Sequence, residues 1–266
     1  MSEEKYIGVF DSGVGGLSVL TKLLVDFPNE SFVYLGDTAR LPYGAKSKET
    51  IKKYVERNIN FLTSNYPIKA VVVACNSASS VLHDLDLPVK TIGVIEAGAD
   101  AALSKTKTNH IGLWATRATV SSNEYEKELL NLDDEAKLTS ISCPTLVTLV
   151  EEAGADHPLL EAAFDHYIDK IKDDSEIDTL ILGCTHFPFF KERLATYLKT
   201  KGLHMELADA SEEISIQLKD MLSGSLSLKK NLEDKVLVTD EAPHFKDFIS
   251  SVLPKKYSFS FLKVDL

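Results

Sequence analysis

The chain is poor in cysteine and contains no long hydrophobic run. Its 266 residues include three cysteines, Cys75, Cys143 and Cys184, with no CxxC pair among them. An odd number of unpaired cysteines excludes a disulfide framework and a zinc cluster, and it indicates free thiols in a reducing compartment. The densest apolar run, Ala70–Cys75, is far shorter than the roughly 20 residues that span a bilayer. The N-terminus is acidic where a signal peptide is basic, so we expect a cytoplasmic protein without a membrane partner.

Positive charge is also scarce. Lys and Arg number 29 against 40 Asp and Glu, which gives a formal net charge of −11. Nucleic-acid binding depends on a basic face that releases counterions, so this balance argues against a nucleic-acid partner. Hydrophobic residues make up 44% and charged residues 26%, as in ordinary globular proteins. The length suffices for one large or two small domains with real hydrophobic cores.

Short apolar runs alternate with helical patterns along the whole chain. Several runs are apolar without alternation, which is typical of parallel strands covered on both faces. The pattern predicts an α/β fold with these strands: Tyr6–Phe10, Phe32–Leu35, Ala70–Ala74, Thr91–Val94, His110–Trp114, Leu138–Ser142, Thr179–Leu182 and Val236–Thr239.

Three amphipathic stretches carry helix-start signals. Ser47 precedes a helical apolar face that begins at Ile51, and Ser211 precedes another that begins at Ile214. Serine is a favoured N-cap residue, so we expect both to cap helices. Pro158 is expected at the first position of a helix, where its missing N–H costs nothing.

A faint internal repeat relates the two halves of the chain. Residues 7–13 (IGVFDSG) resemble 111–117 (IGLWATR), and residues 70–80 (AVVVACNSASS) resemble 179–189 (TLILGCTHFPF). The repeat predicts two similar lobes, each with a cysteine in a loop that follows a strand. Because ligands in open α/β sheets bind beyond the carboxyl ends of the strands, Cys75 and Cys184 are expected to face each other across a cleft.

Two opposed thiols suit a particular reaction. A helix N-terminus after each strand would lower the thiol pKa and favour the thiolate. One group could then remove a proton from a carbon while the other returns a proton to the opposite face, which inverts configuration without a cofactor. His186, two residues after Cys184, leaves open a cysteine hydrolase that acts by acyl transfer. Cys143 has no such context and is interpreted as structural.

Other polar segments are less specific. Residues 11–16 (DSGVGG) follow a strand, but their spacing is not that of a dinucleotide or phosphate loop. Asp11 could be an ordinary cap or could assist a thiol. Residues 36–44 (GDTARLPYG) have the composition of a turn-rich surface loop, although Tyr43 could line a pocket. Glu151 and Glu152 fit a solvated face, and the histidines lack metal-ligand spacing, so no metal is expected.

Six segments together resemble the bacterial glutamate racemases of the aspartate/glutamate racemase superfamily. They occur in that family's order and cover the chain to about residue 190: VFDSGVGGLSVL, YLGDTARLPYG, ACNSAS, GVIEAG, SCPTLVTLVEE and LGCTHFP. The cysteine motifs are the specific ones, and the histidine after the second CT points to glutamate. Ser77 stands where threonine is frequent, which keeps the hydroxyl.

The resemblance implies a role for each matching residue. Cys75 would handle the Cα proton of D-glutamate and Cys184 that of L-glutamate. Asp11 and His186 would assist the thiols, and Glu151 would support His186. The substrate pocket would be lined by Asp11, Ser12, Tyr43, Gly44, Asn76, Ser77, Thr116, Thr119, Thr185 and His186.

The resemblance also implies the architecture and the biological role. It implies two pseudo-symmetric α/β lobes with mostly parallel sheets and the active site between them. The expected domains are residues 1–97 plus 208–266, and residues 98–207. The expected product is D-glutamate for peptidoglycan, made without a cofactor or metal; a homodimer is left open. The alternatives are an aspartate or hydantoin racemase, a malonate decarboxylase, or a non-catalytic binding protein of the same fold.

Overall fold

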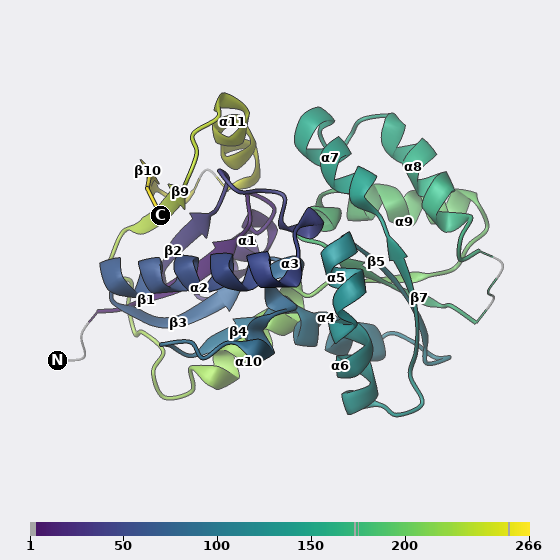
Figure 1. Ribbon diagram of the computed structural model, residues 1–266, viewed down its shortest axis with the longest axis horizontal. Helices are drawn as coiled ribbons and strands as arrows, with labels where there is room; N and C mark the ends of the chain where they lie inside the picture. The colour runs from purple at the N-terminus through teal and green to yellow at the C-terminus, as the bar shows by residue number, and fades with distance from the viewer. Residues whose placement is uncertain (1–3, 173, 175, 255) are drawn as a thin grey trace.

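The protein is built around two separate parallel β-sheets. The computed structural model describes residues 4–172, 174, 176–254 and 256–266. The first sheet has the strand order β10-β9-β2-β1-β3-β4, and every neighbouring pair is parallel. Its strands are β1 (Tyr6–Asp11), β2 (Ser31–Gly36), β3 (Ile68–Val73), β4 (Thr91–Gly93), β9 (Asp234–Val238) and β10 (Phe259–Lys263). The last two strands therefore bring the C-terminal part of the chain back to the first lobe (Figure 1).

The second sheet repeats the core of the first. Its order is β6-β5-β7-β8, again all parallel, which matches the order β2-β1-β3-β4 position by position. Its strands are β5 (His110–Ala115), β6 (Lys137–Ser142), β7 (Thr179–Gly183) and β8 (Glu206–Ala208). β1 corresponds to β5 and β3 to β7, which are the pairs that the internal repeat predicts. The prediction of two pseudo-symmetric α/β lobes is confirmed.

Helices cover both faces of each sheet, because the central strands bury apolar side chains on both sides. On the first sheet, α1 (Leu17–Asp26), α10 (Ser211–Met221) and α11 (Pro243–Val252) pack on one face, and α2 (Lys48–Asn65) and α3 (Asn76–Ser79) on the other. On the second sheet, α7 (Pro144–Ala153), α8 (Leu159–Ile168), η3 (Phe187–Phe190) and α9 (Lys191–Thr200) cover one face. The short segments η1 (Tyr43–Ala45), η2 (Leu82–Asp84) and α5 (Arg117–Ser122) lie in connections.

One helix contributes to the cores of both lobes. α4 (Val94–Leu103) and α6 (Glu124–Leu132) cover the other face of the second sheet. α4 also places Val94 and Ala97 in the core of the first sheet, while Ile95 and Ala99 belong to the core of the second. The domain boundary expected between residues 97 and 98 thus falls inside this shared helix, and the division into domains stays a prediction. Among the described residues, no helix combines the length and the apolar character needed to cross a bilayer.

The predicted elements are present with small shifts of their ends. All eight predicted strands form, whereas β8 and β10 were not predicted. Ser47 caps α2 by accepting the Thr50 N–H at 3.3 Å. Two helix starts differ from expectation. Pro158 precedes α8 (Leu159–Ile168), and Ser211 is the first residue of α10 rather than its cap, because Asp209 accepts the Ser211 N–H at 3.0 Å.

Candidate functional site

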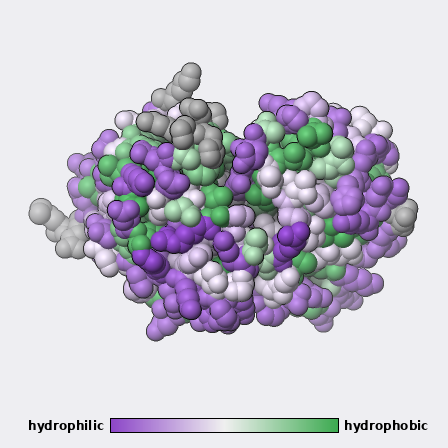
Figure 2. All heavy atoms as spheres, turned by 45° about the horizontal axis from the view of Figure 1, so that its top comes forward, coloured by the Kyte–Doolittle hydropathy of each residue, from purple (hydrophilic) through white to green (hydrophobic). Residues whose placement is uncertain are grey.

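Both repeat cysteines lie just beyond the carboxyl ends of equivalent strands. Cys75 follows β3 and Cys184 follows β7, and the loops that carry them meet between the lobes. Figure 2 shows an indentation where the two lobes adjoin. A narrow internal cavity, here called the cysteine cavity, contains side chains from both lobes. Its lining consists of Ser12, Leu41, Pro42, Tyr43, Gly44, Cys75, Asn76, Ser77, Thr116, Val147, Glu151, Cys184, Thr185 and His186.

The cysteine cavity is tightly closed. The centre of a water-sized sphere can occupy about 20 Å³ of it, which is room for roughly one water molecule. Cys75 and Cys184 are 5% and 6% exposed, so neither thiol is open to bulk solvent. The cavity must therefore widen before it can hold an amino acid.

Cys75 is held at the start of α3. Its Sγ accepts the Ala78 N–H at 3.4 Å, and it lies 3.4 Å from Ser12 Oγ. Burial and the nearby Asp11 carboxylate nevertheless raise the pKa of Cys75 to about 12. The expectation of a lowered thiol pKa at this helix start is therefore wrong for Cys75. The physical reason is that α3 has four residues, so its dipole is too short to offset the desolvation of a buried thiolate.

Cys184 forms a chain of contacts with His186 and Glu151. Cys184 Sγ lies 3.7 Å from His186 Nδ1, and His186 Nε2 lies 3.0 Å from Glu151 Oε1. The second contact has the geometry of an ion pair rather than of an aligned hydrogen bond. Burial lowers the pKa of His186, but its contacts with Cys184 and Glu151 outweigh burial and raise the pKa well above 6.5. These contacts favour the imidazolium form of His186 beside Cys184.

Asp11 lies behind the cavity wall at the end of β1. It is fully buried, and it accepts the Gly13 N–H at 2.8 Å and the Thr185 hydroxyl at 3.3 Å. Burial raises its pKa, although the positive charge of His186 and these hydrogen bonds act in the opposite direction. A buried carboxyl with a raised pKa is a candidate for proton exchange with a neighbouring group.

The glycines after Asp11 allow their loop to pack closely against the end of β1 and against the segment of the second lobe that contains Thr185. A Cβ on Gly16 would lie 2.6 Å from Asp11 Cβ, and a Cβ on Gly15 would lie 2.5 Å from Thr185 Oγ1. Close packing of Gly15 against the second lobe and of Gly16 against Asp11 therefore accounts for these glycines, and no phosphate or dinucleotide is needed to explain the composition.

Hydroxyl and amide groups join the lobes around the cavity. Ser77 Oγ lies 2.8 Å from Thr116 Oγ1, and the Tyr125 hydroxyl donates to Asn76 Oδ1 at 2.7 Å. Thr119 Oγ1 lies 3.1 Å from Thr116 Oγ1 without lining the cavity. These contacts connect α3 of the first lobe with α5 and α6 of the second.

Residues 36–44 form part of the buried site and are not a surface loop throughout, as their composition first indicates. Asp37 and Tyr43 are both fully buried, and the Tyr43 hydroxyl donates to Asp37 Oδ2 at 2.5 Å. Asn58 of α2 donates to the same carboxylate oxygen at 3.3 Å. The ring of Tyr43 thus lines the cysteine cavity, while its hydroxyl group is hydrogen-bonded to Asp37.

The structure brings most of the predicted site residues together, with a few differences. Asp11 and Thr119 contact lining residues without lining the cavity themselves. Leu41, Pro42 and Val147 line it and were not predicted, because apolar residues in a loop or on a helix carry no local signal of a pocket. Tyr125 was also missed, since its role depends on a contact 49 residues away in the sequence.

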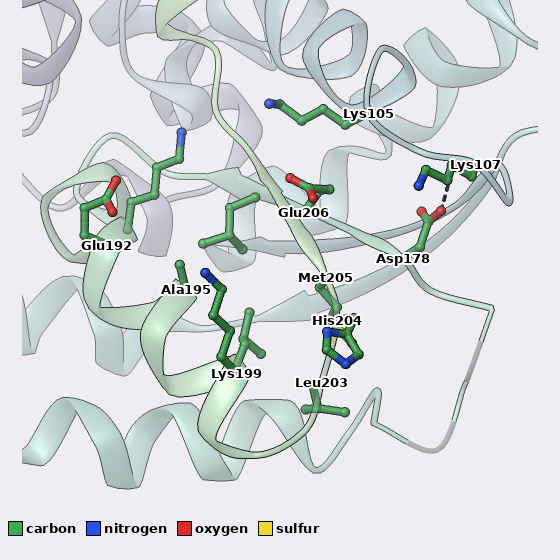
Figure 3. Close-up of a pocket in the computed structure, with 13 residues that line it drawn as sticks. Lys105, Lys107, Asp178, Glu192, Ala195, Lys199, Leu203, His204, Met205 and Glu206 are labelled. Carbon is green, nitrogen blue, oxygen red and sulfur yellow. Dashed lines mark hydrogen bonds between the residues drawn. The ribbon is translucent and has the colours of Figure 1, made fainter.

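Larger cavities elsewhere lack the cysteine pair. One of about 450 Å³ lies between α9 and β8, where Lys105, Lys107 and Lys199 alternate with Glu192 and Glu206 (Figure 3). A group with metal-ligand chemistry lies outside the cavity, where ligand atoms of His83, Glu124 and Glu128 come within 4.8 Å of one another. Glu124 is already paired with Lys127 at 2.7 Å.

Comparison with known proteins agrees with this architecture. The sequence profile described as Asp/Glu/Hydantoin racemase matches residues 21–207. A glutamate racemase of Sulfurihydrogenibium sp. (strain YO3AOP1) is 40% identical over 244 residues, which is 90% of each chain. A crystal structure of a glutamate racemase isoform from Bacillus anthracis superposes with a TM-score of 0.89 at 35% identity, covering 99% of this chain and 98% of that one.

A second crystal structure was determined with a ligand. It is the glutamate racemase of Francisella tularensis in complex with D-glutamate, with a TM-score of 0.87 and 32% identity over 98% of this chain and 97% of that one. The profile match covers more than half of the chain, and the identities exceed 30% over nearly its whole length. The chain therefore belongs to the Asp/Glu/hydantoin racemase family, and it is an isomerase of the amino-acid racemase type.

Proposed function

We propose that this protein interconverts L-glutamate and D-glutamate without a cofactor. The observation that carries the proposal is that Cys75 and Cys184 line one cavity from opposite lobes. Relatives at 32–40% identity are named glutamate racemases, and one of them was crystallised with D-glutamate. His186, which the motif comparison associates with glutamate, lines the same cavity.

The proposed reaction needs two proton-transfer groups on opposite faces of Cα. Starting from L-glutamate, the Cys184 thiolate removes the Cα proton, and the electron pair left on Cα is delocalised into the α-carboxylate. The Cys75 thiol then donates its proton to the other face, which yields D-glutamate. Afterwards Cys184 holds a proton and Cys75 is the thiolate, which is the state that acts on D-glutamate. No electrons are gained or lost.

The neighbouring residues support this exchange of protons. The imidazolium of His186 lies 3.7 Å from Cys184 Sγ, so it favours proton removal by that cysteine. Glu151 keeps His186 charged and oriented. Asp11 is the corresponding acid–base group near Cys75, and it affects the Cys75 pKa through its charge. We assign substrate contacts to the lining residues Ser12, Gly44, Asn76, Ser77, Thr116, Thr185 and His186, and to the ring of Tyr43, whose hydroxyl is bonded to Asp37.

One contact favours a second candidate function. The pair of Cys184 Sγ and His186 Nδ1 is also the arrangement of a cysteine nucleophile with its base. A cysteine hydrolase would form an acyl-enzyme on Cys184 that intact-mass spectrometry detects, and it would have no use for Cys75. The participation of both cysteines therefore separates the two functions.

The test is incubation of the purified protein with L-glutamate alone, followed by chiral separation. We expect D-glutamate to accumulate until both enantiomers are equal, with no added cofactor. L-Aspartate under the same conditions should remain largely unchanged. Failure to form D-glutamate, or faster turnover of aspartate, would refute the assignment of the substrate.

We further propose that the D-glutamate supplies peptidoglycan synthesis. The enzyme names of the relatives are consistent with that role. Depleting the protein in its host should stop cell-wall growth, and D-glutamate in the medium should restore it. Rescue by L-glutamate alone would contradict this role.

A further inference from the structure

A second cavity adjoins the cysteine cavity where the two lobes meet. It measures about 260 Å³, and it lies between the segment that joins η1 to α2 on the first lobe and α5 on the second. Its charged lining residues are Lys46, Lys48 and Arg117, and no carboxylate residue lines it within the described ranges. Hydroxyl groups of Ser47, Ser80, Ser121 and Ser122 complete its polar lining. We call this cavity the basic vestibule.

Two of its cations are not neutralised by a neighbour. Lys48 pairs with Asp84 at 2.8 Å. In contrast, the side chains of Lys46 and Arg117 have no carboxylate partner in the part of the chain that the structure describes. The vestibule also lies at the N-terminal end of the 18-residue helix α2, which adds the positive end of a helix dipole. The vestibule is therefore positive, although the chain as a whole carries a net charge of −11.

The opposite side of the cysteine cavity has a different character. A small cavity there shares Asn76, Cys184 and Thr185 with the cysteine cavity. It contains Asp209 and no lysine or arginine. Because Asp209 is paired with Lys191, this side has little net charge of either sign, and an anion approaching from outside is attracted more strongly to the vestibule side.

The contact of Gly44 with Thr116 lies between the basic vestibule and the cysteine cavity, next to the hydrogen bond of Ser77 with Thr116. Gly44 lines both cavities, and Thr116 in the cysteine cavity precedes Arg117 in the vestibule. A Cβ on Gly44 would lie 2.5 Å from Thr116 Cβ, so the backbone of one lobe directly contacts a side chain of the other. A movement of Thr116 away from Gly44 and Ser77 would open a path between the two cavities.

We infer that the basic vestibule binds the dicarboxylate substrate before it passes between Gly44 and Thr116 to the cysteines. This inference rests on the proposed function, since glutamate carries two carboxylates and one ammonium group. Lys46 and Arg117 bind a carboxylate there and raise the local substrate concentration at the entrance. Electrostatic attraction of this kind acts over about 8 Å at physiological ionic strength and weakens with added salt.

The test compares two double variants with equal net charge. Lys46→Ala/Arg117→Ala removes the two unneutralised cations of the vestibule. Lys105→Ala/Lys199→Ala removes two exposed lysines that line the cavity in Figure 3, so both variants change the net charge from −11 to −13. We expect the vestibule variant to raise KM for glutamate roughly 3- to 10-fold with kcat within twofold, and to lose most of the salt dependence of kcat/KM. The control variant should resemble the wild type.

A binding measurement makes the result independent of catalysis. Glutarate is a dicarboxylate without an α-amino group, and its Kd can be measured by calorimetry at low ionic strength. The vestibule variant should bind it roughly 3- to 10-fold more weakly than the control variant. Equal Kd values in the two variants would overturn the inference. So would equal changes of KM in both variants, or a lower kcat at unchanged KM in the vestibule variant. If the vestibule variant binds glutarate more weakly than the control, as expected, but the wild type does not racemise glutamate, only the proposed function is refuted.

Discussion

At the scale of single residues, the charge of His186 depends on one carboxylate. Glu151 lies 3.0 Å from His186 Nε2 and helps to raise the pKa of His186 well above 6.5. If His186 must be cationic for proton transfer at Cys184, activity declines as the pH rises through the His186 pKa. The negative charge of Glu151 is therefore expected to set the pH at which activity falls on the alkaline side of the profile.

We predict that Glu151→Gln shifts the alkaline limb of the kcat/KM profile to lower pH. Removing the negative charge lowers the His186 pKa, so less imidazolium remains at pH 8, and kcat/KM there should decrease roughly 10-fold. Glu152→Gln is the matched control, because Glu152 is the exposed neighbour in the same helix. A profile of the Glu151 variant that superposes on that of the control would argue against this role.

A second prediction concerns the loop that carries Asp11. Gly16→Ala would place a methyl group 2.6 Å from Asp11 Cβ and 3.0 Å from Ala74 Cβ. Such overpacking should lower the free energy of unfolding by about 1–3 kcal/mol and displace Asp11. Gly13→Ala serves as the comparison, since its Cβ would meet the flexible end of Leu41 at 3.3 Å. Denaturant unfolding should show the larger loss for Gly16→Ala; equal losses would contradict the close-packing explanation.

Much of the site could be predicted from the sequence at this scale. Cys75, Cys184, Asp11 and His186 are placed by short motifs that follow predicted strands, and the strand order brings them together. The raised pKa of Cys75 could not be predicted, because it depends on burial and on the charge of Asp11, which no local pattern encodes.

At the scale of elements, one carboxylate fastens the loop between α4 and β5. Asp178 lies just before β7 and accepts hydrogen bonds from Thr106 Oγ1 at 2.6 Å and from the Lys107 N–H at 2.7 Å. Burial alone would raise its pKa, but these and neighbouring hydrogen bonds lower it below 3.8. The ionised form of Asp178 therefore ties this loop to the sheet of the second lobe.

Asp178→Asn should consequently destabilise the protein in a pH-dependent manner. A depressed carboxyl pKa contributes stability above the unfolded-state pKa, and that contribution disappears as the pH falls through the folded-state value. We expect the variant to melt below the wild type at pH 7, with a loss of roughly 1–2 kcal/mol. The difference should shrink as the pH falls below 3.8. Thermal unfolding across pH 3–7 measures it, and a constant difference would contradict the explanation.

Element boundaries show where sequence patterns are informative. The eight apolar strands were predicted because each is a β-branched or aromatic run. β8 was missed because it has three residues, one of them the exposed Glu206. β10 alternates Phe259 and Phe261 with polar residues, a pattern that could have been recognised. The N-cap of α10 was misplaced by one residue, because Ser211 is the first residue of the helix and the Asp209 side chain accepts its N–H.

At the scale of the whole molecule, the fold places the two repeat cysteines between two similar lobes. The shared strand order puts Cys75 and Cys184 at equivalent positions. α4 packs into both cores, so it can couple any movement of one lobe to the other. Since the cysteine cavity offers about 20 Å³, we expect substrate binding to need a movement that widens it. The repeat predicted the opposed cysteines, whereas this closed state depends on contacts between lobes, such as Gly44 with Thr116, that a sequence pattern does not reveal.

The central claim is that the two cysteines transfer protons on opposite faces of one carbon. Its most direct test follows L-glutamate in deuterated water and determines, by chiral separation with mass spectrometry, how much deuterium the D-glutamate carries at Cα. We expect the wild type to form D-glutamate with deuterium at Cα from the earliest time points. Cys75→Ala and Cys184→Ala should each form it at least about 100-fold more slowly, because every turnover uses both thiols. Product without deuterium at Cα, or a wild-type rate in either variant, would contradict the account.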